Sequence, residues 1–581
     1  MCGILGGTRF KDFDTFKKGQ TTIMHRGYDG NVIFKFKKNK FFICHNRLSI
    51  QDLSESANQP LISEDEKFVL AFNGEMWKPF FRKFNAKLRK KYNFKTDRSD
   101  SELLLYYLIE HRDNLSNAMN DLDGMFCFAF YDVENNKVTL GRDFIGRLPL
   151  YYLAEENTLI FSSEVKAITS SDDNCKFFKS DVKRPTSKKA NEFEDNQEID
   201  FRTLIDSSKN KDEEQKIKDV IKVVEPGTLV SVNCDEKSFD ININRWFNFK
   251  EDFNPIEPNY YPKTNHELEL LETSSNKNDK NNIGVDYYAK EFRNRLEKAV
   301  DDELISDTPI CTILSGGIDS TIITYLLKKK YPNIEAFVVN VDTGRKQTLK
   351  DDLYYAKLAS EEIGVTLNIV NITKEDIEKN LKQSIYAVET HKWTQVAPAA
   401  PQIFLSHEIG RRGFKVVFGG EGADEIFASY GDVKRFCWPN PLHWHQKRVN
   451  LINNLHKNNL IRTNKAMMWG GEVELRTPFL NKDLIDFGLR IPTRYRDEAD
   501  GKGNIMKYVL RKAFEGEISD ELLWRPKKTF QQGCHSDYLK KHQGDIDNFF
   551  EELFVQNKVP FSFKNRNLGQ RSSRIQEIEF A

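Results

Sequence analysis

The sequence predicts an α/β protein of two regions, the first rich in strands and the second built around a parallel sheet. Two observations predict this division. Runs of β-branched and aromatic residues, typical of strands, crowd residues 2–170, whereas short apolar runs alternate with helical segments over residues 286–540. Strands that alternate with helices form βαβ units, and such units build parallel sheets. At 581 residues, the chain is long enough for two large domains.

The N-terminal region holds strand-like runs at residues 31–36, 67–72 and 125–131, and a predicted helix over residues 100–109. Residues 171–220 and 250–285 are rich in Lys, Asp, Asn, Glu and Ser and show no period. This composition predicts a polar insertion and a polar linker. We assign residues 221–249, which lie between them, to the end of the N-terminal domain.

The C-terminal region alternates from residue 286 onward, and a glycine turn follows each of two short apolar runs. The chain after about residue 460 is expected to be helical, and residues 541–581 to form a tail. The helices are predicted over residues 286–303, 320–330 and 353–363, and the strands over residues 310–314, 334–340, 366–372 and 414–418.

Composition excludes several classes of protein. Lys+Arg and Asp+Glu both count 87, so the chain lacks the basic excess typical of nucleic-acid binders. No apolar run approaches the roughly 20 residues of a membrane helix, and the N-terminus does not have the pattern of a signal peptide. The eight cysteines form no Cys-x-x-Cys pair, which argues against a zinc site and favours a reducing, cytoplasmic compartment.

Cys2 is the first residue with evident chemistry. Removal of Met1 would make Cys2 the N-terminal residue, and its free amine could then act as the base for its own thiol. A start of Met-Cys-Gly is weak evidence alone, but an ordered series of motifs follows it. They are His25-Arg-Gly27, Arg47-Leu-Ser-Ile50, Asn73-Gly-Glu75, Ser99-Asp-Ser-Glu102, Gly141-Arg-Asp143 and Ser163-Glu-Val-Lys166.

This series resembles the class II glutamine amidotransferase domain, the glutaminase half of the asparagine synthetase family. The resemblance implies an αββα sandwich of the N-terminal-nucleophile type over residues 2–170, with Cys2 attacking the amide of glutamine. Arg47 would bind the carboxylate of glutamine, and Asp100 and Glu75 its ammonium. The oxyanion would be held by Asn73 and Gly74. The implied glutamine-binding residues are Arg47, Ile50, Asn73, Glu75 and Asp100.

The second chemical feature is the segment Ser315-Gly-Gly-Ile-Asp-Ser320, which follows a predicted strand and precedes a helix. Glycines in that position let backbone N–H groups surround a phosphate. The segment lacks the Gly-Lys-Ser/Thr of a Walker loop and resembles the pyrophosphate-binding loop of ATP pyrophosphatases. The resemblance implies a doubly wound α/β domain that binds ATP. The implied ATP-binding residues are Ile313, Leu314, Ser315, Gly316, Gly317, Asp319, Ser320, Val339 and Gly420.

A second glycine loop, Gly420-Glu-Gly-Ala-Asp-Glu425, follows the predicted strand at 414–418. Loops at the carboxyl ends of parallel strands are where open α/β sheets bind ligands. Asp319 and Asp424 are therefore candidate Mg²⁺ ligands. Lys507 is a candidate to neutralise charge on a phosphoryl group. The segments Arg462–Met467, Glu472–Leu480 and Leu523–Lys527 are again similar to asparagine synthetases, a family in which Asp352, Glu421 and Asp424 would form the aspartate site.

This family resemblance implies a glutamine-dependent asparagine synthetase that uses glutamine, aspartate, ATP and Mg²⁺, without nucleic acid or membrane partners, and a homodimer. One departure concerns the acceptor. Some members have an arginine where this chain has Ala397, so either another residue, such as Lys392 or Arg435, binds the acceptor carboxylate, or the acceptor is a different acid. A related amide-forming ligase and a non-catalytic relative are the alternatives.

Overall fold

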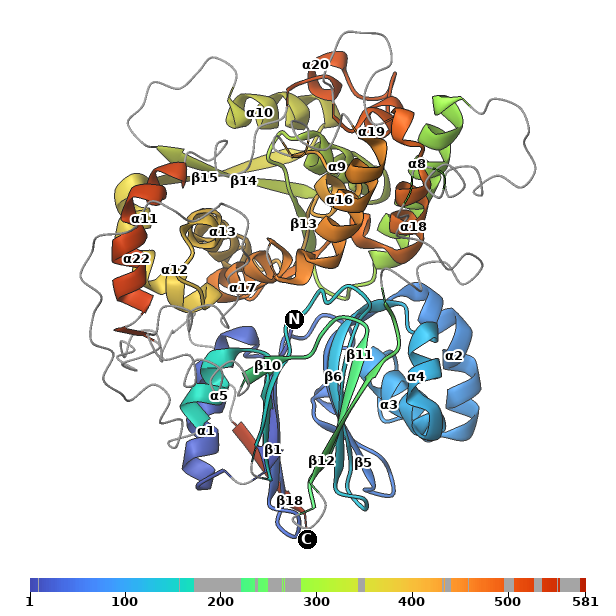
Figure 1. The fold of residues 1–581 in the computed structure, drawn as a ribbon, viewed down its shortest axis with the longest axis vertical. Helices are drawn as coiled ribbons and strands as arrows, with labels where there is room; N and C mark the ends of the chain where they lie inside the picture. Colours follow the sequence, from blue (N-terminus) through green and yellow to red (C-terminus); the bar gives the residue numbers. More distant parts are fainter. Residues whose placement is uncertain are drawn as a thin grey trace.

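The N-terminal part of the chain is a sandwich of two sheets with helices on both outer faces (Figure 1). The computed structural model describes residues 1–8, 10–155, 157–171, 221–235, 239–248, 264, 266, 284–342, 351–430, 433, 440–457, 459–495, 506–526, 536–550, 552–553 and 575–580. Most of the two predicted polar segments, and Arg435, lie outside these residues.

The first sheet has the strand order β10-β8-β9-β1-β3-β2-β18, and the second has the order β12-β11-β7-β6-β5-β4. The strands of the first sheet are β1 (Gly3–Thr8), β2 (Gly30–Phe36), β3 (Phe41–Arg47), β8 (Tyr151–Glu155), β9 (Thr158–Ser162), β10 (Ile221–Val223) and β18 (Ile575–Phe580). Those of the second are β4 (Leu61–Ile62), β5 (Phe68–Met76), β6 (Gly124–Asp132), β7 (Lys137–Arg142), β11 (Thr228–Asn233) and β12 (Asp240–Arg245).

Helices α1 (Phe13–Thr22) and α5 (Val165–Ser171) lie outside the first sheet, and α2 (Lys78–Lys91), α3 (Asp100–Glu110) and α4 (Leu115–Ala118) lie outside the second (Figure 1). The αββα sandwich is therefore confirmed. Helix α3 begins at Asp100 because the hydroxyl of Ser99 accepts a hydrogen bond from the backbone N–H of Glu102, which caps the helix.

The C-terminal domain is built on a five-stranded sheet in the order β15-β14-β13-β16-β17, in which every neighbouring pair is parallel. The chain runs outward from β13 to β15 and then crosses back to β16, so the strand order reverses between β13 and β16. Ligands bind at such a reversal in open α/β sheets. The strands are β13 (Ile310–Ile313), β14 (Glu335–Asp342), β15 (Thr366–Thr373), β16 (Val416–Phe418) and β17 (Glu474–Arg476).

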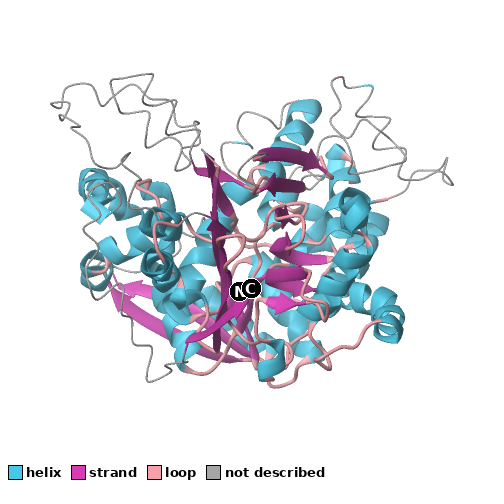
Figure 2. Ribbon diagram, turned by 90° about the horizontal axis from the view of Figure 1, so that it is seen from below, coloured by secondary structure: helices cyan, strands magenta, loops and turns pink. Residues whose placement is uncertain are grey.

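Helices cover both faces of this sheet. On β14, Ala336 packs into one core with Leu327, whereas its neighbour Phe337 packs into another core with Ile403. The predicted doubly wound α/β domain is confirmed. Figure 2 shows helices around the strands in a second view. The helices are α8 (Val285–Glu303), α9 (Ile318–Lys330), α10 (Asp352–Ile363), α11 (Lys374–Lys379), α12 (Leu381–Val388), α13 (Trp393–Arg411), α14 (Ala423–Ile426), α16 (Pro441–Asn453), α17 (Asn459–Gly471), α18 (Lys482–Arg490), α19 (Tyr508–Lys512), α20 (Asp520–Leu523) and α22 (Gln543–Phe550).

The last part of the chain is not wholly helical, which corrects the expectation for the residues after about 460. Strand β17 completes the parallel sheet, and β18 returns to the N-terminal domain, where it pairs in parallel with β2. Neither strand could be predicted from its own residues. Strand β17 has only three residues, and β18 is an edge strand whose partner lies far away in the sequence. Among the described residues, no helix has the length and apolarity needed to cross a bilayer.

Candidate active sites

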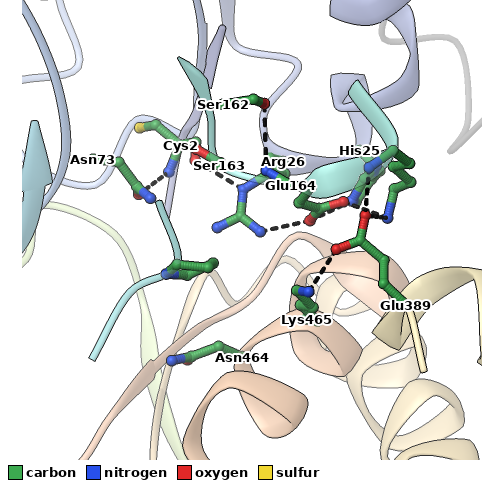
Figure 3. A network of polar contacts seen from close by, with 12 residues as sticks. Cys2, His25, Arg26, Asn73, Ser162, Ser163, Glu164, Glu389, Asn464 and Lys465 are labelled. Carbon is green, nitrogen blue, oxygen red and sulfur yellow. Dashed lines mark hydrogen bonds and ion pairs between the residues drawn. The ribbon is translucent and has the colours of Figure 1, made fainter. Parts of the chain in front are cut away.

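Cys2 lies directly before β1, at the end of the sandwich that faces the C-terminal domain (Figures 1 and 3). Its backbone N–H donates to Asn73 Oδ1 at 2.7 Å, which joins the residue before β1 of one sheet to β5 of the other. The thiol lies 3.8 Å from the carbonyl oxygen of Leu48. Burial raises the pKa of the Cys2 thiol, so the thiol needs a base before it can attack.

Met1 is buried, and its ammonium lies 3.2 Å from Glu474 Oε2 on β17. While Met1 is present, the nitrogen of Cys2 is an amide nitrogen and cannot accept a proton. The base that the sequence predicts for the thiol therefore requires the removal of Met1.

Asn73, Gly74 and Glu75 follow one another on β5. Gly74 has a φ of 142°, and a Cβ added there would lie 2.0 Å from the carbonyl oxygen of Met125, so only glycine fits. The amide nitrogen of Asn73, which the oxyanion role requires, donates to Cys127 Sγ at 3.6 Å in this structure.

The other predicted glutamine-binding residues lie around the same end of the sandwich. The guanidinium of Arg47 donates to carbonyl oxygens of Gln51, Asp52 and Ser54, so it shapes the loop after β3. Burial raises the pKa of Asp100 to about 6. Burial also raises the pKa of Glu75, as do the nearby carboxylates of Glu474 and Asp100. The carbonyl oxygen of Ile50 accepts a hydrogen bond from the backbone of Asp307, in the C-terminal domain.

The predicted pyrophosphate loop connects β13 to α9. Ser320 Oγ lies 3.2 Å from the backbone nitrogen of Ser315 and 3.1 Å from the hydroxyl of Ser315, so the loop is closed by its own serines. Gly316 has a φ of 73°. Helix α9 starts at Ile318, two residues earlier than expected, with Gly317 as its N-cap residue. Leu314 is buried after Ile313, and Val339 is buried on the adjacent strand β14.

Lys507 joins the two glycine loops. Its ammonium lies 2.5 Å from Asp319 and 2.5 Å from Asp424, and its side chain is 2% exposed. Burial lowers the pKa of Lys507, but the two carboxylates outweigh burial and raise that pKa overall. The loops are also close at Gly420, where an added Cβ would lie 2.7 Å from the Cβ of Asp319. Three predicted site residues, Asp319, Asp424 and Lys507, thus form one cluster.

Two arginines complete this region, and neither was predicted as a site residue. Arg525 donates to Asp352 Oδ1 at 2.7 Å and to the carbonyl oxygen of Gly316, so it links the pyrophosphate loop to the predicted aspartate site. Burial raises the pKa of Glu421, and the positive charge of Arg462 opposes that rise. Both arginines lie in segments that are similar to asparagine synthetases, and this similarity could have identified them as candidate site residues.

The position of the missing arginine lies inside α13. Ala397 is fully buried there, and Lys392 is the N-cap residue of the same helix. Arg462 lies on α17, and its positive charge acts on Glu421 of the predicted aspartate site, although position 397 has no arginine.

Comparisons with known proteins agree with this two-site arrangement. Residues 1–238 match the family model described as glutamine amidotransferase domain, and residues 291–440 and 438–562 match asparagine synthase. Asparagine synthetase B [glutamine-hydrolyzing] of Escherichia coli is 28% identical over 88% of this chain and 77% of its own length. The probable asparagine synthetase of Schizosaccharomyces pombe is also 28% identical, over 92% of this chain and 85% of its own. Asparagine synthetase 1 of Saccharomyces cerevisiae is 27% identical over the same shares.

Proposed function

The chain belongs to the family of glutamine-hydrolysing asparagine synthetases, and we propose that its two sites divide the family reaction between them. The N-terminal site would release ammonia from glutamine, and the C-terminal site would use ATP to activate aspartate and would join the ammonia to it. The two domains are in direct contact close to Cys2, where the ammonium of Met1 lies 3.2 Å from Glu474 of β17, which supports transfer of ammonia within one molecule.

At the N-terminal site, the thiol of Cys2 would attack the amide carbon of glutamine, ammonia would leave, and water would hydrolyse the thioester. The α-amine that Cys2 gains when Met1 is removed would accept the thiol proton. Arg47 would bind the α-carboxylate of glutamine, and Asp100 and Glu75 its ammonium. The backbone N–H of Gly74 and the amide of Asn73 would stabilise the oxyanion after the amide of Asn73 turns.

At the C-terminal site, the β-carboxylate of aspartate would attack the α-phosphorus of ATP and pyrophosphate would leave. Ammonia would then displace AMP from the activated carboxyl group and give asparagine. The loop from Ser315 to Ser320 would bind the pyrophosphate portion, and Lys507 would offset charge that develops on the phosphate. Glu421 would accept a proton from the attacking ammonia.

The cluster of Asp319, Asp424 and Lys507 is the observation that carries the synthetase assignment. Two carboxylates and an ammonium from separate loops meet at the sheet edge where a nucleotide is expected. Both carboxylates lie 2.5 Å from the same nitrogen, so these oxygens are within 5.0 Å of each other. Carboxylate oxygens are the ligands that Mg²⁺ prefers, so Asp319 and Asp424 would hold the ion, which would offset phosphate charge when bound.

The acceptor acid is tested directly. Purified protein is incubated with ATP, Mg²⁺ and an ammonium salt, and pyrophosphate release is followed with aspartate, with other carboxylic acids and without any acid. Asparagine formed together with pyrophosphate supports the proposal, with Arg462 as the candidate to bind the acceptor in place of the arginine missing at 397. Turnover with another acid but not with aspartate would contradict it and identify a related ligase.

Substitution of Cys2 tests whether glutamine hydrolysis and asparagine synthesis take place at separate sites. We expect Cys2→Ala to abolish glutamine-dependent synthesis and to leave ammonia-dependent synthesis within about twofold of the parent, because the thiol acts only on glutamine. Both rates are measured as asparagine formed at saturating substrates. Loss of both activities would show that Cys2 does not belong to a separate glutaminase site.

We also propose a cytoplasmic location and a homodimer. The first is supported by the free thiols of Cys2, Cys44, Cys127, Cys234 and Cys311, the cysteines that the structure describes. The second is supported by the family resemblance, and light scattering tests it directly.

A further inference from the structure

Glu389 belongs to the C-terminal domain, yet its carboxylate binds the backbone of the glutaminase domain. It is the C-cap residue of α12 and has a φ of 57°. Its side chain is 1% exposed. One carboxylate oxygen accepts from the backbone N–H of Lys166 at 2.8 Å, and the other accepts from that of Val165 at 3.3 Å. The first turn of α5 is thus held by a residue more than two hundred positions away in the chain.

From α5, a chain of buried contacts leads back to Cys2 (Figure 3). The ammonium of Lys166 pairs with Glu164. Glu164 Oε1 accepts from the guanidinium of Arg26 at 2.7 Å, and Arg26 Nε donates to the carbonyl oxygen of Cys2 itself at 2.9 Å. Arg26, Glu164 and Lys166 are each at most 2% exposed. Because water does not reach these groups, each depends on its protein partners for its position.

Charge balance makes Glu389 important to this chain of contacts. Lys465 of α17 lies 2.5 Å from Glu389, and the pKa of Lys465 is raised because the carboxylate outweighs the effect of burial. Two carboxylates, Glu389 and Glu164, thus pair with three buried cations, Arg26, Lys166 and Lys465, so no carboxylate is in excess. Without the charge of Glu389, Lys166 and Lys465 would compete for Glu164, which would weaken its hold on Arg26.

We propose that Glu389 is a positioning residue for Cys2: by holding α5 and Lys166, it keeps Glu164 and Arg26 in place, and Arg26 orients the backbone of the nucleophile. This inference rests on the proposed role of Cys2 in glutamine hydrolysis. Glu389 has no contact with Arg47, Asp100 or the pyrophosphate loop among the interactions described above, so its effect belongs to the nucleophile and not to substrate binding.

The test is Glu389→Gln, which keeps the shape of the side chain and removes its charge. We expect kcat for glutamine hydrolysis to fall about tenfold, with KM for glutamine within about twofold, because a small displacement of a reacting group lowers the rate. Alkylation of Cys2 by iodoacetamide, followed by mass spectrometry, is expected to slow in parallel. Ammonia-dependent synthesis is expected to stay within about twofold, and it also reports that the variant is folded.

Lys382→Met is the matched control. Lys382 lies on the same helix α12 and pairs with Glu552 at 2.5 Å, at a partly exposed site within the C-terminal domain. Both activities of this variant are expected to equal those of the parent, because exposed ion pairs contribute little.

Three results would overturn the inference: equal loss of both activities in Glu389→Gln, a change confined to KM for glutamine, or kinetics identical to those of the parent. A parent protein that hydrolyses no glutamine would instead contradict the proposed function, which keeps the two failures distinguishable.

Discussion

Burial controls the protonation of the acids around the predicted glutamine pocket. Asp100 is 5% exposed, and its carboxylate accepts a hydrogen bond from the backbone N–H of Met76 at 3.0 Å. That bond favours the ionised form, but loss of water outweighs it and raises the pKa of Asp100 to about 6. An ordinary aspartate would stay ionised to a much lower pH, so Asp100 is sensitive to mild acid.

This pKa predicts an acid limb in glutamine hydrolysis. In the proposed role of Asp100, the ionised carboxylate would attract the ammonium of glutamine, and protonation as pH falls through about 6 would remove that attraction. We expect kcat/KM for glutamine to fall about tenfold per pH unit below that value. The measurement is the pH profile of glutamate release, and Asp100→Asn is expected to have a lower kcat/KM without this limb. The same limb in Asp100→Asn would assign it to another group.

Individual site residues differ in how far the sequence could predict them. Cys2 and Asp100 lie in motifs that resemble those of the amidotransferase domain, so the sequence alone is enough to propose their roles. The sequence also predicts a role for Lys507. Its φ of 64° and its contacts with two separate loops, however, depend on the tertiary structure and could not be predicted. The role inferred for Glu389 has no local signal, because its partners Val165 and Lys166 belong to the other domain.

Among the elements, the loop between β13 and α9 depends most on backbone conformation. Gly316 has a φ of 73°, and a Cβ added there would lie 2.6 Å from the backbone nitrogen of Ala356 and 2.8 Å from the carbonyl oxygen of Asp352. A side chain at this position would therefore push the loop away from α10. The same glycine provides the carbonyl oxygen that Arg525 binds.

We expect Gly316→Ala to lower ammonia-dependent synthesis at least tenfold, because the displaced loop would no longer fit pyrophosphate. The left-handed conformation alone costs about 1–2 kcal/mol for a residue with a side chain, and the contact with α10 adds to that. Glutamine hydrolysis at Cys2 is expected to be unchanged. The measurement compares pyrophosphate release and glutamate release in the same preparation.

Gly364→Ala is the control, since Gly364 has a φ of 74° but an added Cβ would meet nothing within 4 Å. This variant should lose about 1 kcal/mol of stability and retain synthesis. Equal loss of synthesis in both variants would show that backbone strain, and not the fit of the loop, is responsible.

Elements with their own periodic pattern were predicted well, and those defined by distant partners were not. The predicted strand at 125–131 is β6 with one more residue at each end, and the predicted helix at 353–363 is α10 with one more residue at its start. Strand β18, by contrast, depends on β2, more than five hundred residues away in the sequence. The pairing is a property of the folded molecule, so no local window of sequence contains it.

At the scale of the whole molecule, buried charges join the two domains at several points. The guanidinium of Arg147 donates to Glu303 Oε1 at 2.9 Å and to the carbonyl oxygen of Leu480 at 2.6 Å. Arg476 of β17 donates to the carbonyl oxygen of Glu303 at 2.5 Å and lies 3.8 Å from Glu75 of the glutaminase domain. Breaking such a pair leaves a buried charge without its partner, so the domains are expected to unfold together.

Strand β18 adds a link at the opposite end of the sandwich. Its six residues pair with β2 from Asn31 to Phe36. On one face, the ring of Phe580 stacks on that of Phe36 with centroids 4.7 Å apart. On the other face, Glu577 pairs with Lys35 at 2.7 Å and with Lys17 of α1 at 3.1 Å. The strand therefore covers an edge of the first sheet that would otherwise be open to pairing with other chains.

We expect deletion of residues 575–581 to destabilise the glutaminase sandwich by the order of 2 kcal/mol, through lost apolar burial and the lost aromatic pair. Backbone amides of β2 should exchange faster with deuterium, and the open edge should promote self-association in light scattering. Glu577→Lys removes only partly exposed ion pairs, so its effect on stability should be well under half as large. Unchanged exchange in β2 after the deletion would contradict this prediction and would mean that the edge is stable without β18.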